Sequence, residues 1–371
     1  MKRPDLHLRS VLYTLGALAV AGAIGGGAVV GFGLYNTSAK AGHWPGVPWV
    51  LHTTFRNSVD LRAPHEDEVP ELTEDMARLG ARHFDAACTM CHAAPGQERT
   101  ATVRAMVPVP PTIEAAVGDW SPAELHWIVA EGVKMSGMPH WPAARDDDVW
   151  PVVAFLTRVQ GGMDAATYAE WTAPPESDLT PAQAYCAGCH GTDGVSGNPH
   201  IPRLDLQTEA YMAATLQAYR LGQRQSGIMA QAASEAAADR LDALAAWFAA
   251  GGGDAGDAGA AGSSPAAGAT EPDLLARGAE LAARGDRDVP ACTACHGPGA
   301  TRRRADTPRL AGQYRDYLDQ QLHAWRDGHR GGGPRAELMS RAAAELTDDE
   351  IAALAAWYAD LPPETGIEPP E

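Results

Sequence analysis

The sequence predicts an all-α protein made of three small helical domains behind one N-terminal membrane-spanning helix. A chain of 371 residues is long for one domain and suits two or three. Alanine, glycine and proline are abundant and runs of β-branched residues are scarce, which favours helices joined by loops over sheets. A short motif of two cysteines and a histidine occurs three times, and an uncharged run lies near the N-terminus.

The first expected element is a transmembrane anchor at residues 11–35, where no residue carries a charge. At about 1.5 Å per residue, a helix of this length crosses a bilayer. Three basic residues precede it: Lys2, Arg3 and Arg9. The positive-inside rule therefore leaves residues 1–10 in the cytoplasm and the rest of the chain on the other side of the membrane.

A cleaved signal peptide is the alternative interpretation of this run. Ala39, Lys40 and Ala41 form a small-x-small pattern that could be cut. The run is longer than the roughly 7–15 residues of a signal peptide's apolar region, so we expect the anchor to be retained. Residues 36–64 then form a juxtamembrane segment. Its aromatic residues suit either the outer headgroup layer or a partner subunit: Trp44, Trp49 and Phe55.

All six cysteines lie in three copies of Cys-x-x-Cys-His. The copies are Cys88, Cys91 and His92; Cys186, Cys189 and His190; and Cys292, Cys295 and His296. In this motif the thiols form thioether bonds to haem and the histidine reaches the iron. A disulfide framework needs no histidine after every second cysteine, a zinc site would leave one copy unmatched, and no βαβ pattern suggests a thioredoxin-like site. The sequence therefore predicts three covalently bound haem c groups.

The first haem domain is expected at residues 65–163. One helix is expected before its motif, over residues 73–87, and a closing helix near residues 146–159. Apolar residues recur at helical spacing in the closing helix: Val149, Val152, Val153 and Leu156. Asp146, Asp147 and Asp148 favour the N-terminus of that helix through its dipole.

Two further haem domains are expected at residues 177–250 and 272–361, as two copies of one repeat. The copies align at an offset of 106 residues, which becomes 110 after a four-residue insertion near residues 331–334. Self-similarity of this length indicates duplicated domains. Matched pairs include Arg203 with Arg309, Gln207 with Gln313, Tyr211 with Tyr317, Gly222 with Gly328, Met229 with Met339 and Trp247 with Trp357.

Local signals complete these two domains. Residues 251–271 are mostly glycine, alanine and serine, and are expected to form a flexible linker. The helix before Cys186 is expected to be very short. Thr347 to Glu350 form a capping-box pattern, which predicts the start of the last helix.

These features resemble class I cytochromes c, which are all-helical folds with histidine and methionine as haem ligands. Residues 177–361 resemble the tandem di-haem "c-four" class through Cys-x-x-Cys-His-Gly, Pro-Arg-Leu, the Gln…Tyr pair and the closing Ala-Ala-Trp helix. Residues 65–163 resemble a mono-haem class I domain through the loop Ser136-Gly137-Met138-Pro139, which Trp141 follows.

The resemblance implies the remaining ligands. Methionine sulfur is soft and neutral, so it favours ferrous iron and raises the potential. The implied ligands are Met138, with Met135 as the alternative; Met229, with Met212 as the alternative; and Met339, the one methionine of its domain. The resemblance also implies that Pro111, Pro202 and Pro308 accept a hydrogen bond from the ligand histidines, although Pro111 could equally be a plain turn proline. Arg203 and Arg309 could pair with haem propionates or lie free on the surface.

The formal net charge of −18 narrows the possible partners. Nucleic acid is excluded, because its phosphates would be repelled. A protein partner would present a basic patch, unless the acidity serves solubility alone.

Together these features predict a non-enzymatic electron carrier of the bacterial inner membrane, with its haem domains in the periplasm. It would take electrons from a quinol-oxidising complex and deliver them to a terminal oxidase. The alternative is the cytochrome subunit of a periplasmic alcohol, aldehyde or sugar-acid dehydrogenase. A haem enzyme, such as a peroxidase or a sulfur-compound dehydrogenase, needs an open or unusual iron site, which a candidate methionine in every domain argues against.

Overall fold

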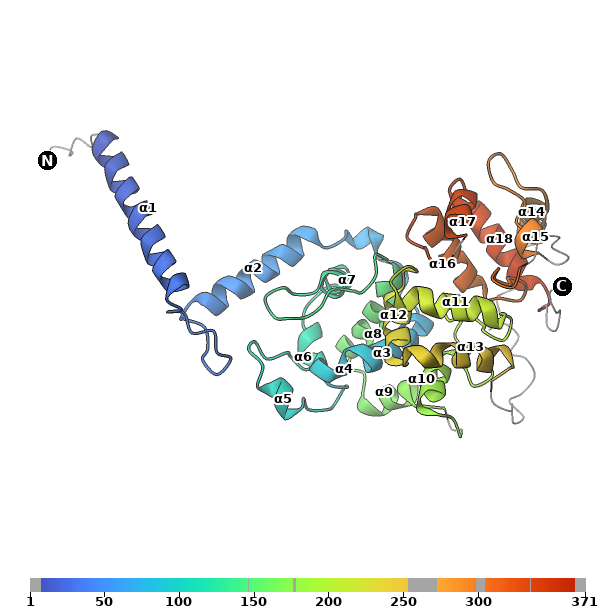
Figure 1. The fold of residues 1–371 in the computed structure, drawn as a ribbon, viewed down its shortest axis with the longest axis horizontal. Coiled ribbons are helices and arrows are strands. Elements are labelled where there is room, and N and C mark those ends of the chain that lie inside the picture. The colour runs from blue at the N-terminus through green and yellow to red at the C-terminus, as the bar shows by residue number, and fades with distance from the viewer. Residues whose placement is uncertain are drawn as a thin grey trace.

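The computed structural model describes residues 8–145, 147–175, 178–252, 272–297, 304–333 and 335–363. Within these ranges the regular structure is helical, apart from two isolated β-bridges that join Val133 to Met138 and Asp286 to Val289. The all-α prediction is confirmed. Figure 1 shows the rod of α1, the shorter α2, and a body of packed helices.

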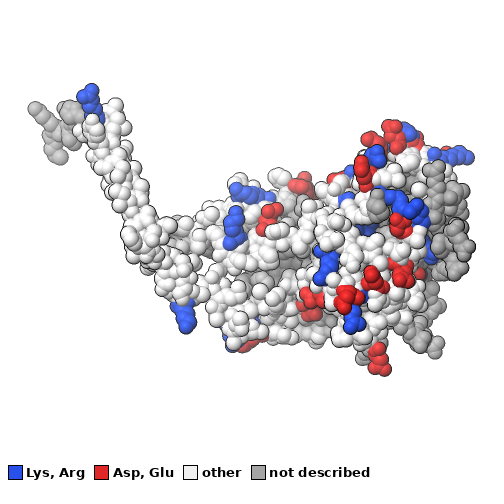
Figure 2. All heavy atoms as spheres, in the orientation of Figure 1, with Lys and Arg blue, Asp and Glu red and all other residues white. Residues whose placement is uncertain are grey.

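Helix α1 (Leu8–Gly31) is long and apolar enough to cross a membrane. None of its residues is buried, and Figure 2 shows it uncharged except near its N-terminal end. It ends four residues before the uncharged run does. The reason is a C-terminal cap: Gly33 takes a φ of 63°, and Leu34 N–H donates to the carbonyl of Val29 at 3.0 Å. A left-handed glycine with this bond terminates a helix whatever the polarity of the residues that follow.

Helix α2 (Val47–Arg62) occupies the predicted juxtamembrane segment and packs on domain one. Val59 is fully buried, the ring of Phe55 lies 5.6 Å from that of Trp120, and the Arg56 guanidinium covers the same indole at 4.6 Å. Phe55 therefore packs within the protein, whereas Trp49 is 71% exposed.

Domain one is built around two crossed helices, α3 (Glu74–Ala87) and α8 (Trp150–Gln160). Gly80 sits at the crossing, because a Cβ there would lie 1.9 Å from the carbonyl oxygen of Pro151. Phe84 and Phe155 fill the core beside it, with their ring centroids 5.0 Å apart. The other elements are η1 (Glu66–Glu68), α4 (Thr89–His92), α5 (Ala101–Arg104), α6 (Ile113–Val117), α7 (Pro122–Glu131) and η2 (Asp147–Val149).

The core of domain one extends past the predicted boundary at residue 163. Helix α9 (Ala165–Thr172) starts at the cap residue Asp164 and buries Tyr168 and Trp171 in that core. The Tyr168 hydroxyl donates to the Asp85 carboxylate at 2.8 Å. This short helix belongs to domain one because its buried aromatic residues are part of the core of that domain.

Domain two consists of α10 (Pro181–His190), α11 (Glu209–Arg220), α12 (Gly227–Glu235), η3 (Ala238–Arg240) and α13 (Leu241–Ala249). Helix α10 begins only five residues before Cys186 and continues through the motif, as expected. The predicted linker at residues 251–271 lies outside the described residues from residue 253 onward.

Domain three consists of α14 (Pro272–Arg284), α15 (Thr293–His296), α16 (Arg315–Arg326), α17 (Ala336–Ala343) and α18 (Asp348–Asp360). Helices α14 and α18 cross at Gly278, where a Cβ would lie 2.2 Å from the carbonyl oxygen of Ala353. The predicted capping box is present, because Thr347 and Glu350 exchange backbone-to-side-chain hydrogen bonds at the start of α18.

Candidate haem-binding sites

Each Cys-x-x-Cys-His motif forms a helical turn. The second motif lies inside α10, and the first cysteines of the other two are the N-cap residues of α4 and α15. A single turn places two thiols and an imidazole close together on one short segment. All six cysteines are half-buried and free of disulfides. Burial, with a smaller effect from the second cysteine of its motif, raises the pKa of the Cys186 thiol to about 11.

The three motif histidines make the same hydrogen bond. Their Nδ1 atoms lie 3.0, 3.2 and 3.0 Å from the carbonyl oxygens of Pro111, Pro202 and Pro308 respectively. Nδ1–H donates in each case, so Nε2 keeps its lone pair. Burial lowers the pKa of His190 to about 4 and also lowers the pKa values of His92 and His296. Neutral imidazoles with a free Nε2 are suited to bind iron, and the proline acceptors implied by the resemblance are all found, including Pro111.

Met138 lies in a tight loop after α7. Val133 N–H donates to the Met138 carbonyl at 3.1 Å, and Gly132 (φ 66°) closes the loop because a Cβ there would lie 2.5 Å from the carbonyl carbon of Pro139. The alternative, Met135, is 39% exposed near the loop's tip.

Met229 and Met339 occupy matching helices. Met229 is the third residue of α12, and Met339 is the fourth of α17, where it packs on the same core as Cys292. Met212, the alternative to Met229, is buried in α11 against Ala245 and Phe248. This packing explains Met212 as a residue of the hydrophobic core.

Two arginines, the buried Arg224 and the half-buried Arg330, bear on whether these domains fit haem. Arg224 donates to the hydroxyls of Tyr211 and Thr215, both at 3.0 Å, and to that of Tyr317 at 3.4 Å. Arg330, its repeat partner, lies over the Trp325 ring. Within the described ranges neither forms an ion pair, and the Nε of each has no acceptor. Burial and the charge of Arg224 lower the pKa of Arg330. Cations withdrawn from water need anions nearby, and the propionates of a bound haem would supply them.

Arg203 is a weaker candidate for that role. Its guanidinium already makes a bidentate pair with Asp205, at 3.0 and 2.6 Å. The propionate pairing considered for Arg203 therefore has a competitor within its own domain.

Domain two and domain three meet through a reciprocal pair of glutamines. The Gln313 side chain accepts from Arg203 N–H at 2.9 Å and donates to its carbonyl at 3.0 Å. Gln207 does the same to Arg309, at 3.1 and 2.8 Å. Because these residues match across the 106-residue offset, the two repeats face each other with approximate two-fold symmetry.

The four-residue insertion of domain three also lies against domain two. A Cβ at Gly331 would lie 2.6 Å from the carbonyl oxygen of Gln223, and one at Gly332 would lie 2.7 Å from the Cβ of Arg224. The glycines of the insertion therefore permit close packing of the repeats.

The aspartates ahead of α8 differ from the expectation. Asp147 pairs with Arg145, and Asp148 reaches across to the start of α12 in domain two. Asp146 lies outside the described residues. The buried carboxylate of Asp148 thus binds the first turn of a helix in another domain.

Comparison with known proteins agrees with this arrangement. The family model described as "Cytochrome C oxidase, cbb3-type, subunit III" matches residues 75–156. The family model described as "Cytochrome c" matches residues 180–242 and 275–361. Each of the three predicted haem domains is therefore matched by a cytochrome family.

Three curated relatives resemble about half of this chain. Two are thiosulfate dehydrogenase electron acceptors. That of Thiomonas intermedia is 35% identical over 54% of this chain and 88% of the relative, and that of Stutzerimonas stutzeri is 38% identical over 50% and 83%. The third is cytochrome c4 of Pseudomonas aeruginosa, 31% identical over 48% of this chain and 84% of the relative.

Proposed function

Because this chain belongs to the class I c-type cytochromes and carries three motifs for covalent haem c, we propose that it is a membrane-anchored electron carrier from a quinol-oxidising complex to a terminal oxidase. Its relatives are electron-transfer cytochromes, so the chain is an electron-transfer protein and not an enzyme. The observation that carries the proposal is the histidine–proline hydrogen bond, repeated in three domains.

The proposed iron ligands are His92 with Met138, His190 with Met229, and His296 with Met339. The Nδ1–H bonds to proline support the histidines, since they orient each ring and leave Nε2 available. The burial of Met212 in a core supports Met229 as the methionine ligand of domain two, because Met212 was its alternative. When bound, haem c with such ligands exchanges single electrons at high potential. The protein's part is to orient the ligands and to bury the cations that balance the propionates.

A terminal oxidase as electron acceptor is supported by domain one. That domain resembles an oxidase subunit, and α2 packs it close to the chain segment that follows α1. A retained α1 anchor would hold domain one at the periplasmic face of the inner membrane, where an integral oxidase presents its docking surface. Edman sequencing of the purified membrane protein tests the anchor, because a cleaved chain would begin after α1.

Electron flow tests the proposal. The full-length holoprotein in detergent is mixed with a quinol-oxidising complex and quinol, and then with a haem–copper oxidase under air. We expect rapid reduction of the cytochrome followed by oxygen uptake that depends on it. Rapid reduction without oxygen uptake would contradict the proposed acceptor.

The second candidate is the electron acceptor of a periplasmic dehydrogenase. The sequence suggests an alcohol, aldehyde or sugar acid as that enzyme's substrate. Two relatives, 35% and 38% identical, are electron acceptors of thiosulfate dehydrogenase and favour a sulfur compound instead. Reduction by thiosulfate and a thiosulfate dehydrogenase, with no reduction by the quinol-oxidising complex, would favour this candidate over the first.

A further inference from the structure

Domain one places a buried carboxylate at the start of the helix that carries Met229. Oδ2 of Asp148 accepts hydrogen bonds from Gly227 N–H at 2.7 Å and Ile228 N–H at 3.3 Å, and from the Ser226 hydroxyl at 3.1 Å. These donors are the cap and first two residues of α12. The first N–H groups of a helix lack partners within it, and its dipole favours an anion there. Domain one therefore completes the cap of a helix in domain two.

Domain one packs closely against the start of α12 around this carboxylate. Gly227 lies against the indole of Trp141, and a Cβ there would come within 2.3 Å of the indole nitrogen. Ile228 packs on the core of domain one. Ala144 N–H donates to the Gln225 side chain at 3.0 Å. Since Trp141 closely follows Met138, the methionine segments of the first two domains lie against each other.

A chain of two hydrogen bonds leads from Asp148 to Met229. The Ser226 hydroxyl donates to the Asp148 carboxylate, and the same oxygen accepts from Met229 N–H at 3.2 Å. One hydroxyl therefore holds the backbone of the methionine and is itself held by the other domain. Loss of the carboxylate would leave Ser226 and two helix N–H groups unsatisfied in a buried interface.

No such cap is found in the part of domain three that the structure describes. Its methionine helix, α17, begins at Ala336, and the N-cap residue Arg335 provides no side-chain cap. The Arg335 guanidinium instead makes a bidentate pair with Asp306 of its own domain, at 2.7 Å. The two repeats therefore hold their methionine helices differently, and Met339 serves as an internal reference for Met229.

We propose that Asp148 is a positioning residue through which domain one holds Met229 in place as a ligand of the second haem. This inference rests on the proposed assignment of Met229 as that ligand. Asp148 acts through the Ser226 hydroxyl and the first turn of α12. The ligand set of the second haem then depends on the docking of domain one, whereas that of the third does not.

The test compares Asp148→Ala and Asp148→Asn with matched changes at Asp239, an exposed aspartate of η3 in domain two. The near-infrared Fe–S(Met) band of the oxidised holoprotein is measured at constant haem content, followed by titration with imidazole. Asp148→Ala is expected to lose about one third of the band and to bind imidazole at one haem, because one of three methionine sites is loosened. Asp148→Asn keeps an acceptor oxygen and should lose less. The Asp239 variants should match the wild type.

A Met229→Ala variant separates the two claims. If it keeps the whole band, the ligand assignment fails and the inference fails with it. If Met229→Ala loses about one third of the band and Asp148→Ala loses none, the positioning role alone is overturned. Should Asp148→Ala not mature with three haems, Ser226→Ala decides in the same way, since it removes the hydroxyl that links the two residues.

Discussion

Gln313 forms two hydrogen bonds with the backbone of Arg203, at 2.9 and 3.0 Å, across the boundary between the two repeats. Both groups are buried, so the side-chain amide replaces water for an N–H and a carbonyl at once. Gln207 repeats the pattern in the opposite direction. The pair explains how duplicated domains with a long connection are held in one arrangement.

Replacing Gln313 should therefore loosen this interface. Gln313→Ala leaves an N–H and a carbonyl of Arg203 unsatisfied, which costs about 1–3 kcal/mol per buried group. Equilibrium denaturation followed by haem absorbance would measure the loss in free energy of unfolding. Gln97→Ala, an exposed position in domain one, should remain within about 0.5 kcal/mol of the wild type. Equal stabilities for the two variants would show that the glutamine pair does not stabilise the interface between the repeats.

The helix crossing of domain one gives a second prediction. Alanine favours a helix over glycine by about 1 kcal/mol, but a Cβ at Gly80 would overlap the Pro151 carbonyl oxygen at 1.9 Å. Gly80→Ala should thus lower the stability of the domain by more than about 3 kcal/mol, because backbone must move. Thermal unfolding compared with Gly197→Ala, where a Cβ meets nothing within 4 Å, checks this. A Gly80→Ala variant more stable than the wild type would contradict the close packing of α3 against α8 at this residue.

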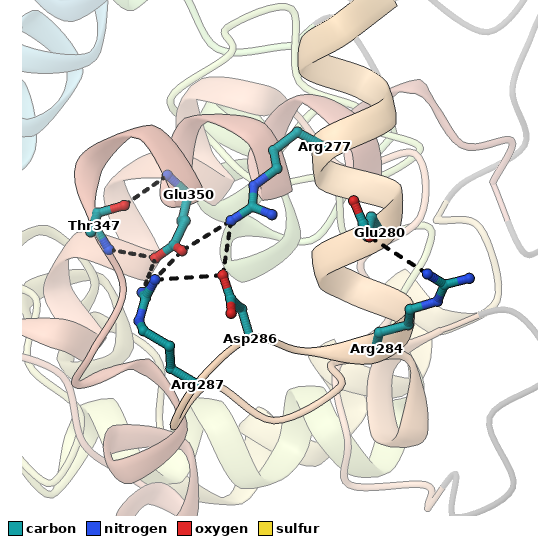
Figure 3. Close-up of polar contacts among 7 residues, drawn as sticks. All are labelled: Arg277, Glu280, Arg284, Asp286, Arg287, Thr347 and Glu350. Carbon is teal, nitrogen blue, oxygen red and sulfur yellow. Dashed lines mark hydrogen bonds and ion pairs between the residues drawn. The ribbon is translucent and has the colours of Figure 1, made fainter.

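The pH dependence of domain three should follow the carboxylate cluster of Figure 3. Burial alone would raise the pKa of Glu350, but hydrogen bonds from Thr347 and Arg287 outweigh it and lower that pKa below 4.5. A hydrogen bond from Arg277 likewise lowers the pKa of Asp286 below 3.8. A lowered pKa stabilises the folded state above the unfolded value, and this stabilisation is lost as the pH falls through the folded value.

Glu350→Gln should accordingly be less stable than the wild type by about 1–2 kcal/mol at pH 7. The difference should stay constant down to about pH 4.5 and shrink below it, as the wild-type carboxylate takes up a proton. Denaturation series between pH 3 and 7 measure it. Glu345→Gln, at an exposed position of the same domain, provides the control. A difference that grows on acidification would reverse the assigned sign.

The attachment of α2 to domain one can be tested by hydrogen exchange. Phe55→Ala removes the ring that meets Trp120 at 5.6 Å and should speed amide exchange across α2 severalfold. Trp49→Ala, on the same helix but 71% exposed, should leave exchange unchanged. If both variants exchange alike, α2 is not held by this contact.

The haem sites could be predicted because their signals are local. Two thiols and an imidazole in one turn need no distant residue, and the 106-residue repeat aligns the second and third sites. The helix α2 also had a signal, since Leu51, Phe55 and Val59 recur every four residues. Because the segment directly follows an apolar run, the sequence left two places open for its aromatic residues, the headgroup layer and a partner subunit.

The role of Asp148 could not be predicted. Three aspartates ahead of a helix have a sufficient local explanation in the helix dipole. Only the tertiary packing shows that Asp148 bonds to α12, 79 residues later in the chain. The end of α1 was missed for a related reason, because hydropathy does not report the left-handed conformation of Gly33.

The central claim is that the chain holds three histidine–methionine haem sites that carry electrons. A redox-titrated visible and near-infrared spectrum of the full-length holoprotein tests it most directly. We predict three low-spin haems of high potential, with an Fe–S(Met) band from each that disappears on reduction. A high-spin haem, or a band that accounts for fewer than three sites, would contradict the claim and would indicate catalysis at the domain concerned.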